Sequence, residues 1–317
     1  MLVISPQNEV LLLHRVKTST SFASAHVFPG GNLSTQDGPC PSAQDDLEGH
    51  HADGPWYRHA AIRELFEESG ILLARDSSGG MLRLDDEETE RGRRAVHANQ
   101  VSFRDWLGDR SAVGDIGMFV SFKKKKKKNH SNRKDGLIPF SRWITPTHAP
   151  RRYTTQMYLY FLPVQQQGTL PDEKHVPTGD GGREVTEAKF LPASEWVRLA
   201  QSGQIILFPP QFLLLHFVAG FLDQQQQSGT TGRKDLEAQR DALRAFAHSG
   251  SPPWTQKCIS PKMWKTAADG RVVLALDQPG PELKGLRGGD SEWVVLVRFT
   301  KGEAREVSVQ KKNSSVL

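Results

Sequence analysis

The residues best suited to chemistry lie in one short run, Arg63-Glu64-Leu65-Phe66-Glu67-Glu68-Ser69-Gly70-Ile71. On a helix, Glu64, Glu67 and Glu68 fall within about 100° of one another, with Ile62, Leu65 and Phe66 on the opposite side. Like-charged neighbours cost roughly 0.2–0.5 kcal/mol per pair on an isolated helix. Clustered carboxylates are typical ligands of Mg²⁺ or Mn²⁺, although a Glu-rich helix face is also typical of plain solvated surface. The spacing alone leaves both interpretations open.

Local signals around the run predict the elements that position it. Pro55 suits a first helical turn, Asp53 is a plausible N-cap and Gly70 a stop, which predicts a helix over 56–69. Two apolar runs, Leu2–Ile4 and Val10–His14, flank a polar turn and predict an opening β-hairpin.

With Phe28-Pro29-Gly30-Gly31 upstream, the run resembles the Nudix box, Gly-x5-Glu-x7-Arg-Glu-U-x-Glu-Glu-x-Gly-U, where U is aliphatic. The second half matches at every specified position. The first half departs from the pattern, because Arg63 lies 32 residues after Gly31 and about 18 residues are therefore inserted. Asp53 and Glu48 are nearby acids, but the first glutamate of the box stays unassigned.

The resemblance implies roles for these residues. Glu64, Glu67 and Glu68 would bind Mg²⁺ or Mn²⁺, with the Gly31 carbonyl as a further ligand and Arg63 orienting the carboxylates. The catalytic residues would then be Glu64, Glu67 and Arg63, with Glu64 the first choice for the base that activates water. Two acids near the predicted strand 187–191 are alternative bases or ordinary surface charges: Glu184 and Glu187.

Segments outside the box are similar to the Nudix branch that contains the peroxisomal coenzyme A diphosphatase. They are 10–15, 24–31, 60–73, 147–158 and 190–196. The resemblance implies a hydrolase of phosphorus-containing acid anhydrides that cleaves CoA or acyl-CoA to 3′,5′-ADP and a phosphopantetheine. Arg151 and Arg152 are expected to contact phosphate, or to be ordinary surface cations. NADH, ADP-ribose and other nucleoside diphosphate derivatives remain alternative substrates, and a non-catalytic nucleotide- or protein-binding module remains a different class of function.

The net charge of +5 does not indicate a nucleic-acid partner. Subtracting the six consecutive lysines Lys123–Lys128 from +5 leaves −1, so the positive charge is local. RNA decapping would favour aromatic residues interleaved with the basic ones, and the lysine run has none. We therefore expect a small nucleotide-type substrate.

The fold class expected is α+β, a Nudix fold with a mixed β-sheet between helices (α/β/α). The expected domains are 1–222 (Nudix domain, with loop insertions 32–55 and 123–135), 223–250 (linker and helix) and 251–317 (a β-rich C-terminal extension). The extension would pack on the first domain or complete a homodimer.

Two distant cysteines and the lack of a long apolar run favour an intracellular, soluble protein with no membrane partner. No targeting signal is seen, and the C-terminal Ser-Val-Leu differs from the peroxisomal Ser-Lys-Leu. Peroxisome or mitochondrion follows from the family resemblance alone. Because Met1 directly precedes the first strand, a preceding segment with a targeting signal stays an open alternative.

Overall fold

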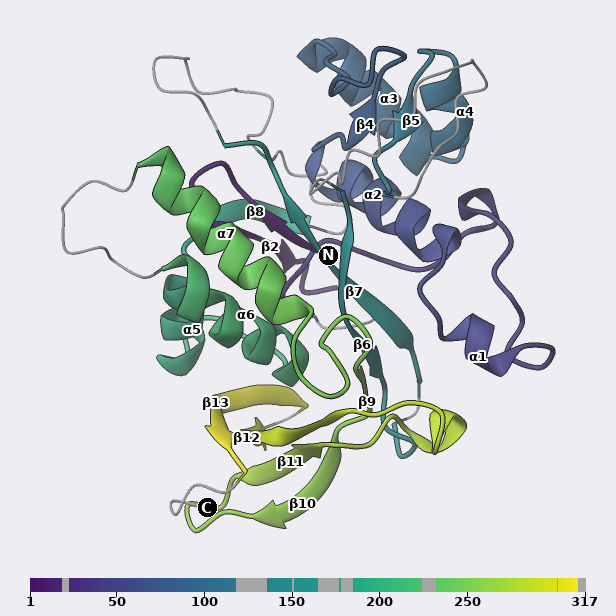
Figure 1. The fold of residues 1–317 in the computed structure, drawn as a ribbon. Coiled ribbons are helices and arrows are strands. Elements are labelled where there is room, and N and C mark those ends of the chain that lie inside the picture. The colour runs from purple at the N-terminus through teal and green to yellow at the C-terminus, as the bar shows by residue number, and fades with distance from the viewer. Residues whose placement is uncertain are drawn as a thin grey trace.

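The computed structural model describes residues 1–18, 23–117, 136–149, 151–164, 177, 185–223, 232–300 and 302–312. Within these residues, a seven-stranded mixed sheet forms the centre of the molecule (Figure 1). Its order is β3-β2-β1-β7-β6-β9, and β8 pairs with β2. The strands are β1 (Leu2–Ile4), β2 (Val10–Arg15), β3 (His26–Val27), β6 (Ile138–Ile144), β7 (Thr154–Phe161), β8 (Val185–Leu191) and β9 (Cys258–Ile259).

The predicted opening hairpin is present as β1 and β2, paired antiparallel through Ile4 and Val10. Ser5 stabilises the turn because its hydroxyl accepts hydrogen bonds from the backbone N–H groups of Gln7 and Glu9. Asn8 adopts a left-handed φ of 66°, a conformation that Asn tolerates better than most residues. β1 then pairs in parallel with β7 and lies inside the sheet.

The predicted acidic helix is α2 (Pro55–Ser69). Pro55 occupies its first turn, and Gly70 ends it with a left-handed φ of 73°. The N-cap is Gly54, so the assignment of Asp53 as the cap was wrong. The Asp53 carboxylate instead pairs with Arg58 at 2.6 Å and accepts a hydrogen bond from the Tyr158 hydroxyl at 2.6 Å.

The structure contains several helices that the sequence signals did not predict. The stretch 32–55, predicted as a surface loop, contains η1 (Thr35–Asp37) and α1 (Leu47–His50). Downstream of α2 come α3 (Asp86–His97) and α4 (Phe103–Gly108), flanked by the short strands β4 (Ala74–Arg75) and β5 (Val113–Gly114). The Asp85 side chain caps α3, and acids fill its first turn, as the helix dipole favours.

The two faces of the central sheet pack on different helices. Leu11 and Leu13 of β2 share a core cluster with Ile62 and Leu65 of α2. Val10 and Leu12 share another cluster with α5 (Ala193–Gln201) and α6 (Pro209–Leu222). Figure 1 shows α2 on one side of the sheet and α5, α6 and α7 (Arg233–Ala247) on the other. The predicted α/β/α arrangement is confirmed.

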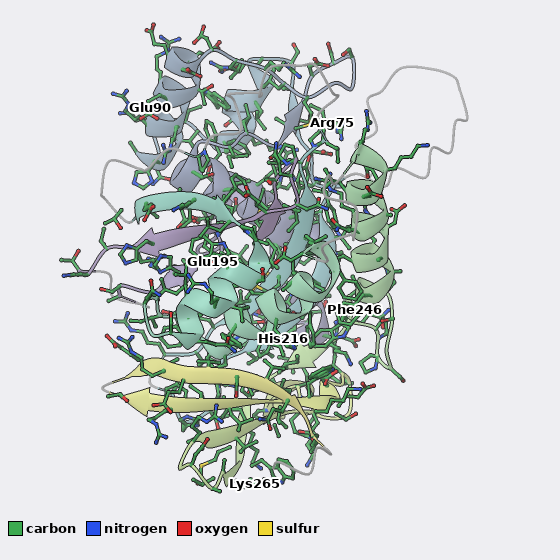
Figure 2. The ribbon with its side chains drawn as sticks, turned by 90° about the vertical axis from the view of Figure 1, so that its left-hand side faces the viewer. Arg75, Glu90, Glu195, His216, Phe246 and Lys265 are labelled. Atoms are coloured by element: carbon green, nitrogen blue, oxygen red, sulfur yellow. The ribbon has the colours of Figure 1, made fainter. Side chains whose placement is uncertain are left out.

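The C-terminal residues form a four-stranded antiparallel sheet at the end of the molecule opposite α3 and α4 (Figure 1). Its strands are β10 (Lys262–Thr266), β11 (Val272–Leu276), β12 (Asp290–Thr300) and β13 (Glu303–Lys311), with η3 (Pro281–Leu283) between β11 and β12. This sheet packs against α5 and α6 (Figure 2). The ring centroids of His216 and Trp293 are 5.9 Å apart. The expected β-rich extension thus packs on the first domain, whereas the homodimer stays a prediction.

The largest apolar cluster crosses the predicted domain boundaries at 222 and 251, since it joins Leu12, Leu214 and Val295. The division into three domains therefore stays a prediction. Among the described residues, no helix is long and apolar enough to cross a membrane. Cys40 and Cys258 are free thiols. The lysine run Lys123–Lys128 lies outside the described residues.

Candidate active site

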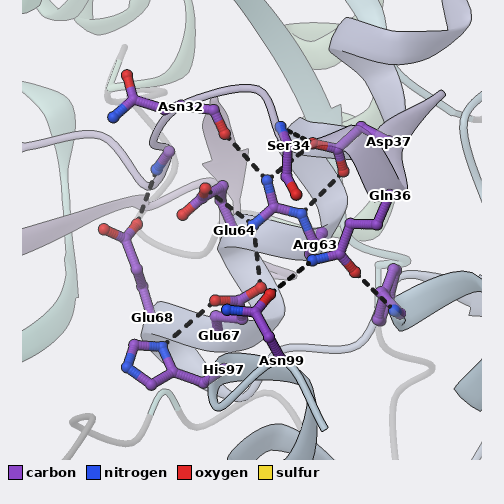
Figure 3. A network of polar contacts seen from close by, with 12 residues as sticks. Asn32, Ser34, Gln36, Asp37, Arg63, Glu64, Glu67, Glu68, His97 and Asn99 are labelled. Carbon is purple, nitrogen blue, oxygen red and sulfur yellow. Dashed lines mark hydrogen bonds and ion pairs between the residues drawn. The ribbon is translucent and has the colours of Figure 1, made fainter. Parts of the chain in front are cut away.

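The acidic face of α2 lies against the loop that contains Gly30 and Gly31 (Figure 3). The apolar positions of the same helix, Ile62, Leu65 and Phe66, are fully buried. Burying each such side chain contributes about 1.5–3 kcal/mol, which fixes the rotation of α2 about its axis. The carboxylates of Glu64, Glu67 and Glu68 consequently share the opposite side, as the spacing predicts.

Arg63 is the centre of the polar network in Figure 3. One guanidinium nitrogen, Nη1, donates to Oε1 of Glu64 at 2.9 Å and to Oε1 of Glu67 at 3.0 Å. The other two nitrogens form a fork on Asp37, with Nε donating to Oδ1 at 2.8 Å and Nη2 to Oδ2 at 2.9 Å. The planar guanidinium thus holds three carboxylates at once, a geometry that a lysine ammonium cannot reproduce.

Asp37 is the site residue that the sequence analysis missed. Its side chain is only 2% exposed, and it sits in η1 with a further hydrogen bond from the Ser34 N–H at 2.7 Å. In the box the acid stands eight positions before the arginine, and counting back from Arg63 gives Pro55, which is not an acid. The acid also stands six positions after the leading glycine, and counting forward from Gly31 gives Asp37, so the insertion lies after the acid and not before it.

The glycines allow close approach of the loop to the helix. The Gly30 N–H donates to Oε2 of Glu68 at 2.7 Å, and Arg15 of β2 lies 3.9 Å from the other oxygen. A Cβ atom added to Gly31 would lie 2.6 Å from the Glu64 carboxyl group. Any side chain at Gly31 would therefore displace Glu64.

The buried charges shift one another's protonation. Burial raises the pKa of Glu64 to about 7, against the opposing effect of Arg63 and with a further increase from Glu67. Burial acts to lower the pKa of Arg63, but Asp37, Glu64 and Glu67 outweigh it and raise that pKa. The guanidinium is therefore charged and faces more acids than it can neutralise.

The donor set fits a hard divalent cation, because Glu64, Glu67, Glu68 and the Gly31 carbonyl all offer oxygen. Within the part of the chain that the structure describes, no three Asp, Glu, His or Cys side chains converge enough to hold an ion by themselves. Mg²⁺ commonly keeps several waters and takes oxygens from substrate phosphate, so it needs few protein ligands. The predicted ligands thus have the oxygen donors that a divalent cation prefers, whereas their coordination geometry stays a prediction.

The other predicted site residues lie elsewhere. The Arg152 guanidinium pairs with Glu282 and donates to the Thr145 carbonyl at 3.0 Å, and Arg151 beside it is exposed. Glu187 on β8 is exposed and pairs in register with His14 of β2. Glu184 lies outside the described residues. The phosphate-binding and alternative-base roles of these residues stay predictions.

The register of β2 and β8 fixes the direction of Glu187. Leu13 packs with the α2 core and Arg15 approaches Glu68, so His14 between them points to the opposite face of the sheet. Directly paired residues of neighbouring strands share a face. Glu187 therefore points away from α2.

The chain is similar to several known proteins, although no protein-family model matches it. It is 27% identical to putative nudix hydrolase 7 of Caenorhabditis elegans, over 67% of this chain and 56% of that protein. It is 27% identical to the acyl-coenzyme A diphosphatase NUDT19 of Gallus gallus, over 87% of this chain and 72% of that protein. The NUDT19 of Xenopus laevis is 24% identical, over 67% of this chain and 60% of that protein.

A solved structure supports the fold independently. The crystal structure of a NUDIX hydrolase from Alicyclobacillus acidocaldarius matches with a TM-score of 0.51 and 22% identity, over 70% of this chain and 89% of that one. At this identity the match carries the fold alone. The chain spans 56% of the length of the worm relative and 60% of the frog relative.

Proposed function

We propose that the chain is a Nudix hydrolase and that it hydrolyses the diphosphate linkage of CoA or acyl-CoA. The products would be 3′,5′-ADP and phosphopantetheine or its acyl form. The observation that carries the proposal is that Glu64 and Glu67 of α2 share the buried Arg63, while Glu68 of the same helix accepts a hydrogen bond from Gly30. A surface helix has no need of repelling acids held in this way by a buried arginine and a glycine loop.

The choice of CoA rests on the relatives. Two of them are named acyl-coenzyme A diphosphatases, and the alignment with the chicken protein covers 87% of this chain. The similarity thus extends well beyond the box-like segment. The box itself does not distinguish CoA from NADH or ADP-ribose, so the substrate needs a direct test.

The role proposed for each residue follows from the position of its side chain. Glu64, Glu67, Glu68 and the Gly31 carbonyl would hold Mg²⁺ or Mn²⁺, which when bound lowers the pKa of water and neutralises phosphate charge. Arg63 fixes the orientation of Glu64 and Glu67 through its shared Nη1. Glu64 is the proposed base: it accepts a proton from the water that attacks phosphorus, while the bond from phosphorus to the bridging oxygen breaks.

The experiment is product analysis with a substrate panel of CoA, acetyl-CoA, NADH, ADP-ribose and capped RNA, each with Mg²⁺ or Mn²⁺. Wild type is compared with Glu67→Gln, which removes one carboxylate and keeps its size. Arg94→Ala is the matched control, because Arg94 is exposed on the neighbouring helix α3. We expect selective cleavage of CoA or its acyl form in wild type and control, and loss of about 10²-fold or more in Glu67→Gln.

Other outcomes separate the parts of the proposal. Cleavage of NADH or ADP-ribose alone would keep the reaction and change the substrate. Equal cleavage by wild type and Glu67→Gln would overturn the assigned site. Absence of cleavage across the panel, with folded protein, would favour a nucleotide- or protein-binding module.

A further inference from the structure

Glu67 is held from two different helices. Arg63 of α2 donates to its Oε1 at 3.0 Å, and the Nδ1 of His97 lies 3.3 Å from its Oε2 (Figure 3). Arg63 belongs to the box-like run. His97 is the last residue of α3 and lies 30 residues beyond Glu67, outside every pattern used in the sequence analysis.

A second contact fixes α3 to the same residue. The buried Arg93 donates from Nε to the backbone carbonyl of Glu67 at 2.8 Å. Arg93 and His97 lie one helical turn apart, so they project from the same face of α3. One helix therefore holds Glu67 by both its main chain and its carboxylate, which fixes the distance of His97 from the acidic face.

The turn after α3 also reaches the other side of the Arg63 network. Gln36 of η1, next to Asp37, accepts a hydrogen bond from the Phe103 N–H at 2.9 Å. Its side-chain amide lies 3.5 Å from the Asn99 side chain. The α3–α4 segment thus contacts both Glu67 and the short helix that carries Asp37.

The contact between His97 and Glu67 requires no charge on the imidazole. At 3.3 Å the Nδ1 of His97 lies within ion-pair distance of Oε2, and a ring that carries its proton on Nδ1 attracts the carboxylate. Each carboxylate oxygen has two lone pairs, so Oε2 can keep this contact and still coordinate an ion. Contacts of this kind orient metal-binding side chains, and their loss typically costs about 10–100-fold in metal affinity or activity.

We propose that His97 is a positioning residue for the metal site: it holds the Glu67 carboxylate in the orientation that binds the divalent ion. The inference rests on the proposed function for the role of Glu67 and adds a determinant from α3. Arg63 alone holds one oxygen of Glu67, which leaves the second free to rotate away. His97 removes that freedom before the ion binds.

The test measures ion binding without substrate. Mn²⁺ is titrated into wild type, His97→Ala, His97→Asn and Arg94→Ala, and free Mn²⁺ is followed by electron paramagnetic resonance. We expect the dissociation constant to rise about 10–100-fold in His97→Ala. The Asn amide nitrogen can occupy the place of Nδ1, so His97→Asn should recover most of the affinity. Arg94→Ala should match wild type, and thermal unfolding checks that each variant is folded.

Kinetics separate this inference from the proposed function. At saturating metal, His97→Ala should lower kcat with little change in KM for the substrate. An unchanged Mn²⁺ dissociation constant in folded His97→Ala, or no recovery in His97→Asn, would overturn the role of His97 even if wild type cleaves CoA. Weakened Mn²⁺ binding in His97→Ala, with no cleavage of any panel member by wild type, would keep the role and overturn the hydrolase proposal.

Discussion

Arg63 and Arg240 are both buried, yet they lie in regions of opposite electrostatic character. Arg63 contacts the carboxylates of Asp37, Glu64 and Glu67. Arg240 of α7 donates to neutral oxygens, at 2.6 Å to the Asn8 side chain, 2.8 Å to the Leu162 carbonyl and 2.6 Å to the Ser5 carbonyl. Burial lowers the pKa of Arg240 to about 10, partly offset by Glu237.

The difference in charge balance distinguishes a site that can bind an ion from a contact that only holds two parts of the fold together. Around Arg63 the acids outnumber the guanidinium, and the remaining negative charge attracts a cation. Around Arg240 the donors and acceptors are matched, and the result is an attachment of α7 to the β1–β2 turn. The first arrangement is suited to binding an ion, and the second to holding the fold together.

The largest expected effect is that of Arg63→Met. The change leaves Asp37 buried with no cation on its carboxylate, and breaking a buried ion pair in this way typically costs about 3–5 kcal/mol. We expect a loss of that size in the free energy of unfolding, measured by urea denaturation, together with loss of hydrolysis. Arg63→Lys keeps the charge but not the fork, so it should fall between wild type and Arg63→Met. Stability of Arg63→Met within about 1 kcal/mol of wild type would argue against a central role for this ion-pair network.

Arg240→Met should have a smaller effect of a different kind. It leaves neutral acceptors unsatisfied, which costs about 1–3 kcal/mol in the free energy of unfolding. Turnover per folded molecule should stay unchanged, because Arg240 contacts the β1–β2 turn and not α2. The measurement pairs urea denaturation with kcat at a temperature where the variant is folded. A fall in kcat larger than the loss of folded protein would show that the contact of Arg240 with the β1–β2 turn also affects the geometry of the candidate active site.

Local signals in the sequence were sufficient to predict the helix α2 and the opening hairpin of β1 and β2. Pro55 and Gly70 act on the backbone of their own turns, and apolar spacing sets the buried face of the helix. Asp53 shows the limit of such signals. Its carboxylate is taken by Arg58 and Tyr158, and Tyr158 lies more than a hundred residues away in sequence.

The parts of the site that escaped prediction depend on tertiary contacts. Asp37 reaches Arg63 across an insertion, so the spacing back from Arg63 pointed to the wrong position. His97 reaches Glu67 through the packing of α3 on α2, and no spacing rule encodes it. The carboxylates themselves were predictable because one helix carries all three.

A pH series tests a histidine outside the acidic site: the Nδ1 of His51 lies 2.9 Å from the Thr154 hydroxyl oxygen. Burial lowers the pKa of His51 to about 4, aided by Arg142, His50 and Arg287 and opposed by Glu282. Between pH 6.5 and 4 the unfolded chain therefore binds a proton that folded His51 does not, so the free energy of unfolding falls as the pH falls. His51→Gln should show a shallower decrease in urea denaturation at pH 6.5, 5.5 and 4.5. Parallel curves for the two proteins would contradict the assignment.

The smallest expected effect is that of Glu187→Gln, which tests the two faces of the sheet. Because Glu187 pairs with His14 on the face away from α2, its carboxylate cannot take a proton from water held at Glu64 without a change of register. We expect kcat to change by less than about twofold, whereas removal of a general base typically costs about 10²–10⁴-fold. Stopped assays under the conditions of the substrate panel are sufficient to resolve this difference. A loss of about a hundredfold would mean that the β8 edge rearranges during turnover, and it would move the base from Glu64 to Glu187.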